Sequence, residues 1–239
     1  MCGIVGYIGD NAVQNVLNGL ETLEYRGYDS AGIAVSKNGS IKIIKREGRL
    51  EVLKQAVDID GTLAIGHTRW STHGKPTETN AHPHTAGKIT LVHNGIIENF
   101  HHLKQLSWLR DIELVSETDT EIIAHIINLM EGPTLFAKVE MALSHLQGSY
   151  ALVVVSEDEP DTIVVARKHS PLVVGVLDNG AVIASDIQAI LPHTNKIVVL
   201  ADFDIGIVKK NEITLYQHGQ RITREPLEIA WSVAQSSKG

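Results

Sequence analysis

A cysteine stands second in this chain, and it is the only cysteine among 239 residues. If Met1 is removed, Cys2 carries a thiol and a free α-amine in one residue. An α-amine has a pKa of roughly 7.7–8.0, so it can act as a general base near neutral pH. Cys2 could then supply both nucleophile and base, as in an N-terminal nucleophile enzyme. An ordinary buried thiol on a first strand is the alternative, and position alone leaves both readings open.

Four further segments combine glycine with polar residues: 25–32, 67–74, 93–99 and 116–121. We expect each to lie where a strand or helix ends, because scaffolds present reactive groups at such places. The twelve histidines include His82 and His84 on either side of a proline. That pair suggests a metal site, but there is no cysteine cluster and no His-Glu-x-x-His helix. Loop histidines held by hydrogen bonds are the preferred interpretation.

The elements that must position these segments are predicted from periodicity. Strands are expected at 3–8, 63–67 and 89–93, and a hairpin at Asn38–Gly39. A helix from about Asn11 has its apolar residues on one face, and Gly27 is placed to stop it. Further helices are expected at 99–106, 120–130 and 135–146, with Thr118 and Glu121 as a capping box for the second. The stretch 70–87 is predicted to be irregular.

The chain from Ser149 onward consists of short β-branched runs separated by turn residues. These runs cover 151–155, 162–166, 172–177, 181–184, 196–200, 205–208 and 212–216. Short connections favour antiparallel pairing. Strands with a few amphipathic helices predict two stacked sheets covered by helices. The segment 232–239 is small and polar, which is typical of a linker.

The composition of the chain argues against several classes of function. The formal net charge is -7 without a block of like charges, which argues against nucleic-acid and membrane partners. A single cysteine allows no internal disulfide, so we expect a reducing cytoplasmic location. Neither a signal peptide nor an apolar run long enough to span a bilayer is visible.

Together, the five motifs resemble those of the class II glutamine amidotransferases. These five motifs are 2–6 (CGIVG), 25–32, 67–74, 93–99 and 116–121. The runs 25–29 (YRGYD), 69–74 (RWSTHG) and 80–84 (NAHPH) more narrowly resemble the glutaminase domain of the glucosamine-6-phosphate synthase family. The resemblance extends from Cys2 to about Trp231. It implies an α+β fold, a four-layer αββα sandwich of N-terminal nucleophile hydrolase type with mostly antiparallel sheets.

The resemblance also implies roles for individual residues. Cys2 would attack the side-chain amide of L-glutamine, and Asn94 and Gly95 would donate to the oxyanion. Arg69 would bind the substrate α-carboxylate and Asp119 its α-ammonium.

The remaining candidates are substrate-binding residues around this core. Trp70, Thr72 and His73 would belong to a loop that closes over glutamine. Arg26 would support the geometry of the site, and His82 is predicted to be a further substrate-binding residue.

The resulting prediction is a glutaminase domain over 1–231, followed by the start of an interdomain linker at 232–239. It would release ammonia through a Cys2 thioester, with no metal and no organic cofactor. Expected partners are L-glutamine and, in cis, a C-terminal sugar-isomerase domain, in a full-length homodimer that makes glucosamine-6-phosphate. The alternatives are a glutaminase domain like that of amidophosphoribosyltransferase, a non-catalytic glutamine-sensing module and a metallohydrolase.

Overall fold

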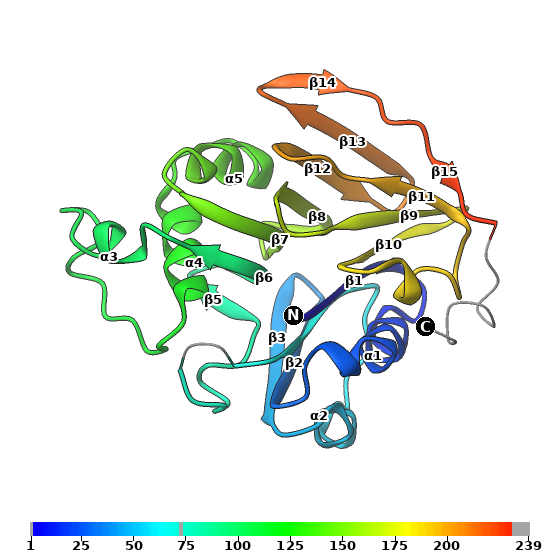
Figure 1. Cartoon of the computed structure of the whole chain (residues 1–239), viewed down its shortest axis with the longest axis horizontal. Coiled ribbons are helices and arrows are strands. Elements are labelled where there is room, and N and C mark those ends of the chain that lie inside the picture. The colour runs from blue at the N-terminus through cyan, green and yellow to red at the C-terminus, as the bar shows by residue number, and fades with distance from the viewer. Residues whose placement is uncertain (1, 72–73, 231–239) are drawn as a thin grey trace.

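The computed structural model describes residues 2–71 and 74–230. Two β-sheets lie face to face in it (Figure 1). One has the strand order β15-β11-β9-β10-β1-β4-β2-β3 and the other β14-β13-β12-β8-β7-β6-β5. All pairings between described strands are antiparallel, as the short connections predicted.

The strands are β1 (Gly3–Gly9), β2 (Ser30–Lys37), β3 (Ser40–Glu47), β4 (Leu63–Arg69), β5 (His84–Ala86), β6 (Ile89–Ile97), β7 (Gly148–Ser156), β8 (Glu159–Lys168), β9 (Val173–Leu177), β10 (Gly180–Ala184), β11 (Lys196–Val199), β12 (Asp204–Lys209), β13 (Glu212–Gln217), β14 (Gln220–Ile222) and β15 (Leu227–Glu228). The helices are α1 (Ala12–Thr22), α2 (Leu50–Ala56), α3 (Phe100–Leu103), α4 (Asp119–Leu129) and α5 (Leu135–Leu143), with 3-10 turns η1 (Glu24–Arg26) and η2 (Ile187–Ala189).

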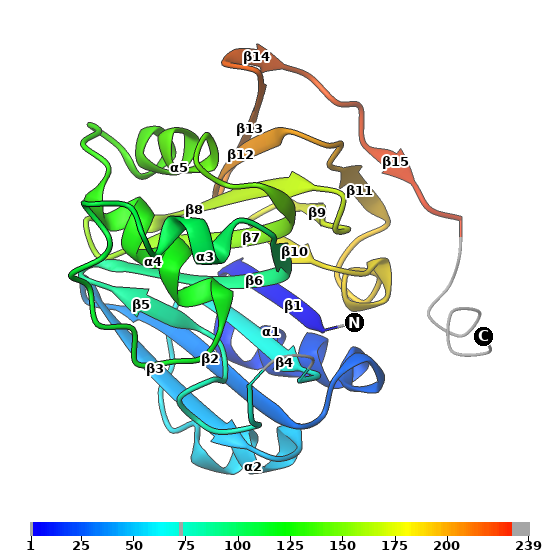
Figure 2. The same ribbon diagram turned by 60° about the vertical axis from the view of Figure 1, so that its left-hand side comes forward.

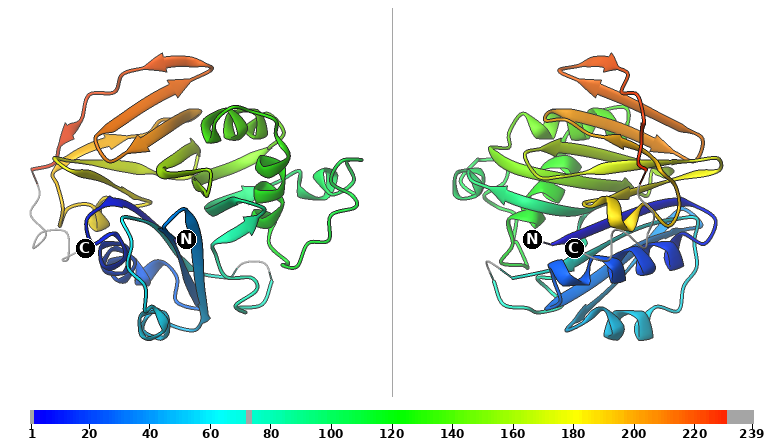
Figure 3. Two further views of the ribbon diagram at one scale, coloured as in Figure 1. Left: turned by 180° about the vertical axis from the view of Figure 1, so that it is seen from behind. Right: turned by 45° about the vertical axis from the view of Figure 1, so that its right-hand side comes forward.

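Three apolar clusters separate four layers. One packs α1 and α2 against the first sheet, one packs α4 and α5 against the second, and one fills the space between the sheets. Alternate residues of β1 serve different clusters: Val5 packs toward α1, whereas Ile4 and Ile8 pack between the sheets. The two helix pairs lie on opposite sides of the molecule (Figure 2, Figure 3). The predicted αββα sandwich is therefore confirmed.

The Asn38–Gly39 hairpin is confirmed: it joins β2 to β3, with φ of 53° and 79° at the two turn residues. The predicted strands from residue 151 onward are all present. Helix α2 and the short strands β5, β14 and β15 were not predicted. The segment 70–87, expected to be irregular, contains β5.

Three local predictions were wrong. Helix α1 ends at Thr22, and Gly27 has an extended φ of -172° instead of ending the helix. Thr118 makes no side-chain capping bond to α4: its hydroxyl lies 3.0 Å from Nε2 of His84, and Glu121 accepts from the backbone N–H groups of Val115 and Ser116. Strand β6 continues through Asn94–Gly95 to Ile97, where the sequence predicted its end.

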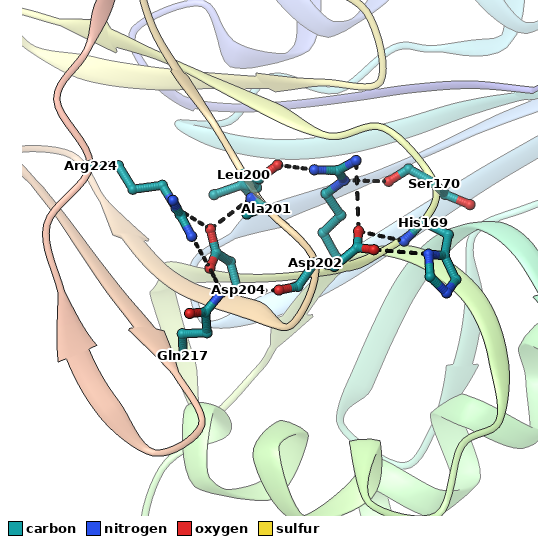
Figure 4. A network of polar contacts seen from close by, with 9 residues as sticks. His169, Ser170, Leu200, Ala201, Asp202, Asp204, Gln217 and Arg224 are labelled. Atoms are coloured by element: carbon teal, nitrogen blue, oxygen red, sulfur yellow. Dashed lines mark hydrogen bonds and ion pairs between the residues drawn. The ribbon is translucent and has the colours of Figure 1, made fainter.

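A buried ion pair holds the segment that crosses from β14 in one sheet to β15 in the other. The Asp204 carboxylate is fully buried and is bound by both Nε and Nη2 of Arg224, with Nη2 to Oδ1 at 2.7 Å (Figure 4). The side-chain amide of Gln217 and the backbone N–H of Ala201 also donate to this carboxylate, at 3.1 and 2.8 Å. None of the described helices has the length and apolarity needed to span a bilayer.

Candidate active site

A cavity of about 590 Å³ lies where the start of β1 meets the ends of β4 and β6 and the start of α4. It is lined by all the predicted site residues that the structure describes: Cys2, Arg26, Arg69, Trp70, His82, Asn94, Gly95 and Asp119. The other two, Thr72 and His73, lie outside the described residues. Residues separated by more than a hundred positions thus share one site.

Cys2 is positioned by the backbone of Trp70. The Trp70 N–H donates to Sγ at 3.3 Å, and the thiol lies 3.8 Å from the Trp70 carbonyl oxygen. Burial raises the pKa of the Cys2 thiol, although this backbone contact opposes the shift. Within the described residues, Sγ has no hydrogen bond to an imidazole or a carboxylate. A reactive thiolate therefore needs a base from another source, such as the residue's own α-amine.

Asn94 lies directly beside Cys2. Its side-chain Nδ2 donates to the Cys2 carbonyl oxygen at 2.9 Å, and its Oδ1 lies 3.0 Å from Nε2 of His67. Gly95 has a φ of +137°, and a Cβ there would lie 2.1 Å from the Ser149 carbonyl oxygen. Only glycine fits this position. A polar amide bonded to the backbone of Cys2 and a distorted, side-chain-free backbone thus line the same cavity as the thiol.

Asp119, the first residue of α4, is tied to the end of β6. Its Oδ2 accepts from the Ile97 N–H at 2.8 Å, while its side chain remains about a quarter exposed (27%). Its Oδ1 lies 4.0 Å from Nδ1 of His93, whose closer partner is the Thr120 hydroxyl at 3.0 Å. The carboxylate is therefore held at the cavity wall and can accept further hydrogen bonds.

Arg69 ends β4 and is 5% exposed. Its Nη1 donates to the Ser71 hydroxyl at 3.0 Å and to the Lys75 carbonyl oxygen at 3.2 Å. The guanidinium is buried against the segment that contains Ser71 and Lys75, and these hydrogen bonds hold it at the cavity. Asp29 also binds the loop, since its carboxylate accepts from the Ser71 N–H.

Arg26 and Trp70 form another part of the cavity wall. The Arg26 guanidinium makes an ion pair with Asp186 after β10, and both side chains are largely buried. This pair supports the predicted structural role of Arg26. Trp70 is half exposed and packs edge-on against Tyr28, with ring centroids 5.1 Å apart. Gly27 is needed beneath them, because a Cβ there would lie 2.6 Å from the Arg69 carbonyl carbon.

The cavity is also lined by Ser170 and Pro171, which sequence reasoning missed. The Ser170 carbonyl oxygen accepts from Nε of Arg167 at 3.0 Å, and Arg167 Nη2 lies 3.7 Å from Asp202 (Figure 4). Asp202 also binds Nδ1 of His169 at 2.8 Å. These residues follow β8 without any motif of glycine and polar residues, so no local signal marked them.

Four buried histidines lie close together at the cavity and beneath it: His67, His82, His84 and His93. The rings of His67 and His82 have centroids 4.1 Å apart, and those of His82 and His84 are 4.9 Å apart. Burial lowers the pKa of each imidazole, to about 3 for His67. Among residues 2–71 and 74–230, no three His, Cys, Asp or Glu side chains are placed so that they could hold a metal ion. The cluster consists of neutral imidazoles packed inside the protein.

Comparison with known proteins assigns a class to this fold and site. The chain is similar to a solved glutamine phosphoribosylpyrophosphate amidotransferase from B. subtilis, with a TM-score of 0.80 and 26% identity over 93% of this chain and 50% of the other. A class II glutamine aminotransferase domain protein from Silicibacter pomeroyi shares the fold, with a TM-score of 0.60 and 14% identity over 90% of this chain and 99% of the other. The fold is thus that of the amidotransferases with an N-terminal nucleophile.

The family follows from the sequence match. A model of the glutamine amidotransferase domain matches residues 67–192, and the chain belongs to this family.

Its relatives include two enzymes named glutamine–fructose-6-phosphate aminotransferase (isomerizing). The one from Caldanaerobacter subterraneus is 47% identical over 100% of this chain and 40% of the relative. The one from Pyrococcus horikoshii is 46% identical over 100% of this chain and 42% of the relative. The chain therefore spans about two fifths of the length of these relatives.

Proposed function

We propose that this chain hydrolyses L-glutamine to glutamate and ammonia through a thioester on Cys2. The observation that carries the proposal is the placement of the only cysteine against the Asn94 amide and the Gly95 backbone in one cavity. The thiol loses its proton to a base, and Sγ attacks the carbonyl carbon of the glutamine amide. The resulting oxyanion accepts hydrogen bonds from Asn94 Nδ2 and the Gly95 N–H.

Collapse of this intermediate breaks the C–N bond. The protonated base gives its proton to the leaving nitrogen, ammonia departs, and a thioester remains. Water then attacks the thioester through a second oxyanion at the same donors, releasing glutamate and restoring the thiol. The α-amine of Cys2 is the proposed base, because the thiol contacts only the backbone of Trp70 in the described residues.

The ends of the substrate need separate binding groups. Arg69 is proposed to bind the α-carboxylate and Asp119 the α-ammonium. Trp70, Thr72 and His73 are proposed to close over the substrate and exclude water. Arg26 and His82 are proposed to shape the site around it.

The ammonia acceptor is proposed from the relatives. The relatives are named as aminotransferases that act on glutamine and fructose-6-phosphate. For this chain we propose the same acceptor, with glucosamine-6-phosphate as product, in a longer cytoplasmic homodimer with a sugar-isomerase domain in cis. Residues 1–231 would be the glutaminase domain and 232–239 would begin the linker, although 231–239 lie outside the described residues. Identities of 46–47% to these relatives, against 26% to the phosphoribosylpyrophosphate enzyme, favour the amino-sugar acceptor.

The test of hydrolysis is single labelling of the thiol. A diazo-ketone analogue of glutamine is expected to add once per chain, at Cys2. Cys2→Ala is expected to abolish both labelling and ammonia release, while Cys2→Ser keeps the fold as a control. Ammonia release at the wild-type rate from Cys2→Ala would refute the proposal. Glutamine binding without ammonia release by the wild type would instead indicate a sensing module.

A second test asks whether these 239 residues can transfer the ammonia to a sugar phosphate by themselves. With glutamine and fructose-6-phosphate together, we expect ammonia but no glucosamine-6-phosphate, at a rate that does not change with the sugar phosphate. Mass spectrometry of the products decides this. Formation of the amino sugar would place a second catalytic site within this chain.

A further inference from the structure

The side chain of His67 lies directly behind the proposed oxyanion donor. His67 belongs to β4 and is fully buried, and its Nε2 is 3.0 Å from Oδ1 of Asn94 on β6 of the other sheet. An asparagine amide can be flipped by 180°, which exchanges its donor and acceptor ends. In the flipped state Oδ1, not Nδ2, would face the developing negative charge. What holds the amide orientation therefore matters for the reaction.

The neighbours of Asn94 determine which end of the amide faces where. The Cys2 carbonyl oxygen can only accept hydrogen bonds, so the group 2.9 Å from it must be the NH₂ group. Oδ1 then faces His67, and because Oδ1 can only accept, Nε2 of His67 must carry a hydrogen. The second hydrogen of Asn94 Nδ2 remains for a ligand in the cavity.

The state of the imidazole agrees with this geometry. Burial lowers the pKa of His67 to about 3, so the ring is neutral at pH 7 and carries one N–H. With that hydrogen on Nε2, Nδ1 is a bare acceptor. Nδ1 makes no hydrogen bond of normal geometry within the described residues, so a buried N–H there would be poorly satisfied. The backbone of His93 also interacts with the ring and, together with Asn94, opposes the lowering of the pKa by burial. The His82 ring, 4.1 Å away, packs against His67 and limits its movement.

We propose that His67 is a positioning residue for the oxyanion site: its Nε2–H bonds Oδ1 of Asn94 and holds the amide with Nδ2 directed at the reacting carbonyl. The inference rests on the proposed function for the role of Asn94, but the tautomer of His67 does not depend on that role.

The first measurement is ¹⁵N NMR of histidine-labelled protein at pH 7. We expect one pair of imidazole signals with a protonated Nε2 and an unprotonated Nδ1, assigned to His67 by its loss in His67→Gln. An Nδ1–H tautomer or a doubly protonated ring would overturn the proposal, whether or not the chain hydrolyses glutamine.

The second measurement separates the hydrogen-bond donor from the space that the ring fills. Gln and Met have similar length, but only Gln places an N–H near the position of Nε2. In His67→Met we expect kcat for glutamine hydrolysis to fall about 10–100-fold with KM within about threefold, since a mispositioned group costs up to about 100-fold. His67→Gln is expected to retain kcat within about fivefold.

A matched control comes from the same histidine cluster. His84 is equally buried and bonds the Thr118 hydroxyl at 3.0 Å, without contacting Asn94. His84→Met is expected to keep kcat within about threefold, even if its melting temperature falls. Equal losses of kcat in His84→Met and His67→Met, or equal losses in His67→Gln and His67→Met, would overturn the proposal. Absence of hydrolysis in the wild type would refute the proposed function alone.

Discussion

At the scale of single residues, the site depends on a distortion in β6. Gly95 has a φ of +137° and lies against the Ser149 carbonyl oxygen, so the strand stays paired while its backbone turns at this position. The same distortion lies next to Asn94, whose amide reaches Cys2. An Asn-Gly pair normally indicates a hairpin turn. Here it lies within a strand, because β7 pairs with β6 on both sides of it.

The proposed roles predict different kinetic effects for donors and binding residues. Asn94→Ala is expected to lower kcat about 100–1000-fold, because its hydrogen bond strengthens as the oxyanion forms. Arg69→Lys and Asp119→Asn are expected mainly to raise KM for glutamine, because the charges that they bind do not change during the reaction. Steady-state ammonia release measures both constants. A raised KM with normal kcat in Asn94→Ala would mean that the roles are exchanged.

The raised pKa of Cys2 predicts a dependence on its α-amine. Burial disfavours the thiolate, so at pH 7–8 the thiolate fraction is smaller than in a free cysteine, and it grows as pH rises through the raised pKa. If Met1 stays attached, the nitrogen is an amide without basicity. Activity is then expected to fall about 100–10,000-fold, the usual contribution of general acid–base catalysis.

Mass spectrometry and chromatography can separate the chains with and without Met1 for assay with glutamine. Equal activity of the two forms would remove the α-amine from the mechanism. His93 would be a poor substitute, because its Nδ1 bonds Thr120 and the contacts of the thiol within the described residues are with Trp70.

At the scale of elements, the connection between β4 and β5 depends on a reciprocal contact with the segment before α4. Asn80 Oδ1 accepts from the Glu117 N–H at 2.8 Å, and Asn80 Nδ2 donates to the Glu117 carboxylate at 2.8 Å. The same Nδ2 donates to the Lys75 carbonyl oxygen at 3.0 Å, which in turn accepts from Arg69. One buried amide thus connects this loop, the substrate-binding arginine and the segment leading to Asp119.

Asn80→Ala is expected to raise KM for glutamine about tenfold and to destabilise the fold by about 1–2 kcal/mol. The loop loses three side-chain hydrogen bonds, and Arg69 loses the support of the Lys75 carbonyl. Glutamine kinetics and thermal unfolding measure these effects. The neighbouring exposed Thr79→Ala serves as control and should change neither. An unchanged KM in Asn80→Ala would show that Arg69 is positioned without this loop.

At the scale of the whole molecule, the two sheets are held by the apolar cluster between them and by the chain segment that crosses at their edge. The Asp204–Arg224 pair joins β12 to the segment between β14 and β15. Asp204 is fully buried, and the two neutral donors, the Ala201 N–H and the Gln217 amide, do not neutralise the charge of its carboxylate. Removing one partner of a buried pair costs more than the pair contributes.

Arg224→Leu is therefore expected to lower the free energy of unfolding by about 3 kcal/mol, which corresponds to roughly 6–12 °C in melting temperature. Arg221→Leu on β14 is the matched control, because Arg221 is exposed and has no ion pair in the described part of the chain. It should change stability by less than about 0.5 kcal/mol. The double variant Asp204→Asn with Arg224→Leu should recover part of the loss. If Arg224→Leu and Arg221→Leu were equally stable, the Asp204–Arg224 pair would not have the structural role described.

The elements and the reactive residue types were predictable because they depend on local sequence. Alternation and helical spacing indicated the long strands and α1, α4 and α5, and the motifs identified Cys2, Asn94 and Arg69. The strand and helix pattern predicted two stacked sheets covered by helices, and the family resemblance implied the αββα sandwich of N-terminal nucleophile hydrolase type. These properties need only neighbouring residues or a recognisable pattern.

Only the tertiary structure decided which groups support the site. Glu121 bonds the backbone at Val115 and Ser116 instead of forming the expected capping box, and Gly27 is required by contact with Arg69 rather than by the end of α1. His67 begins the motif 67–74, but no local pattern gave it a supporting role, and Ser170 lies in no motif. His67 reaches Asn94 because β4 of one sheet lies against β6 of the other. Ser170 reaches the cavity from the turn after β8. Contacts between residues so far apart in the chain exist only once the sheets have packed, so no local pattern could specify them.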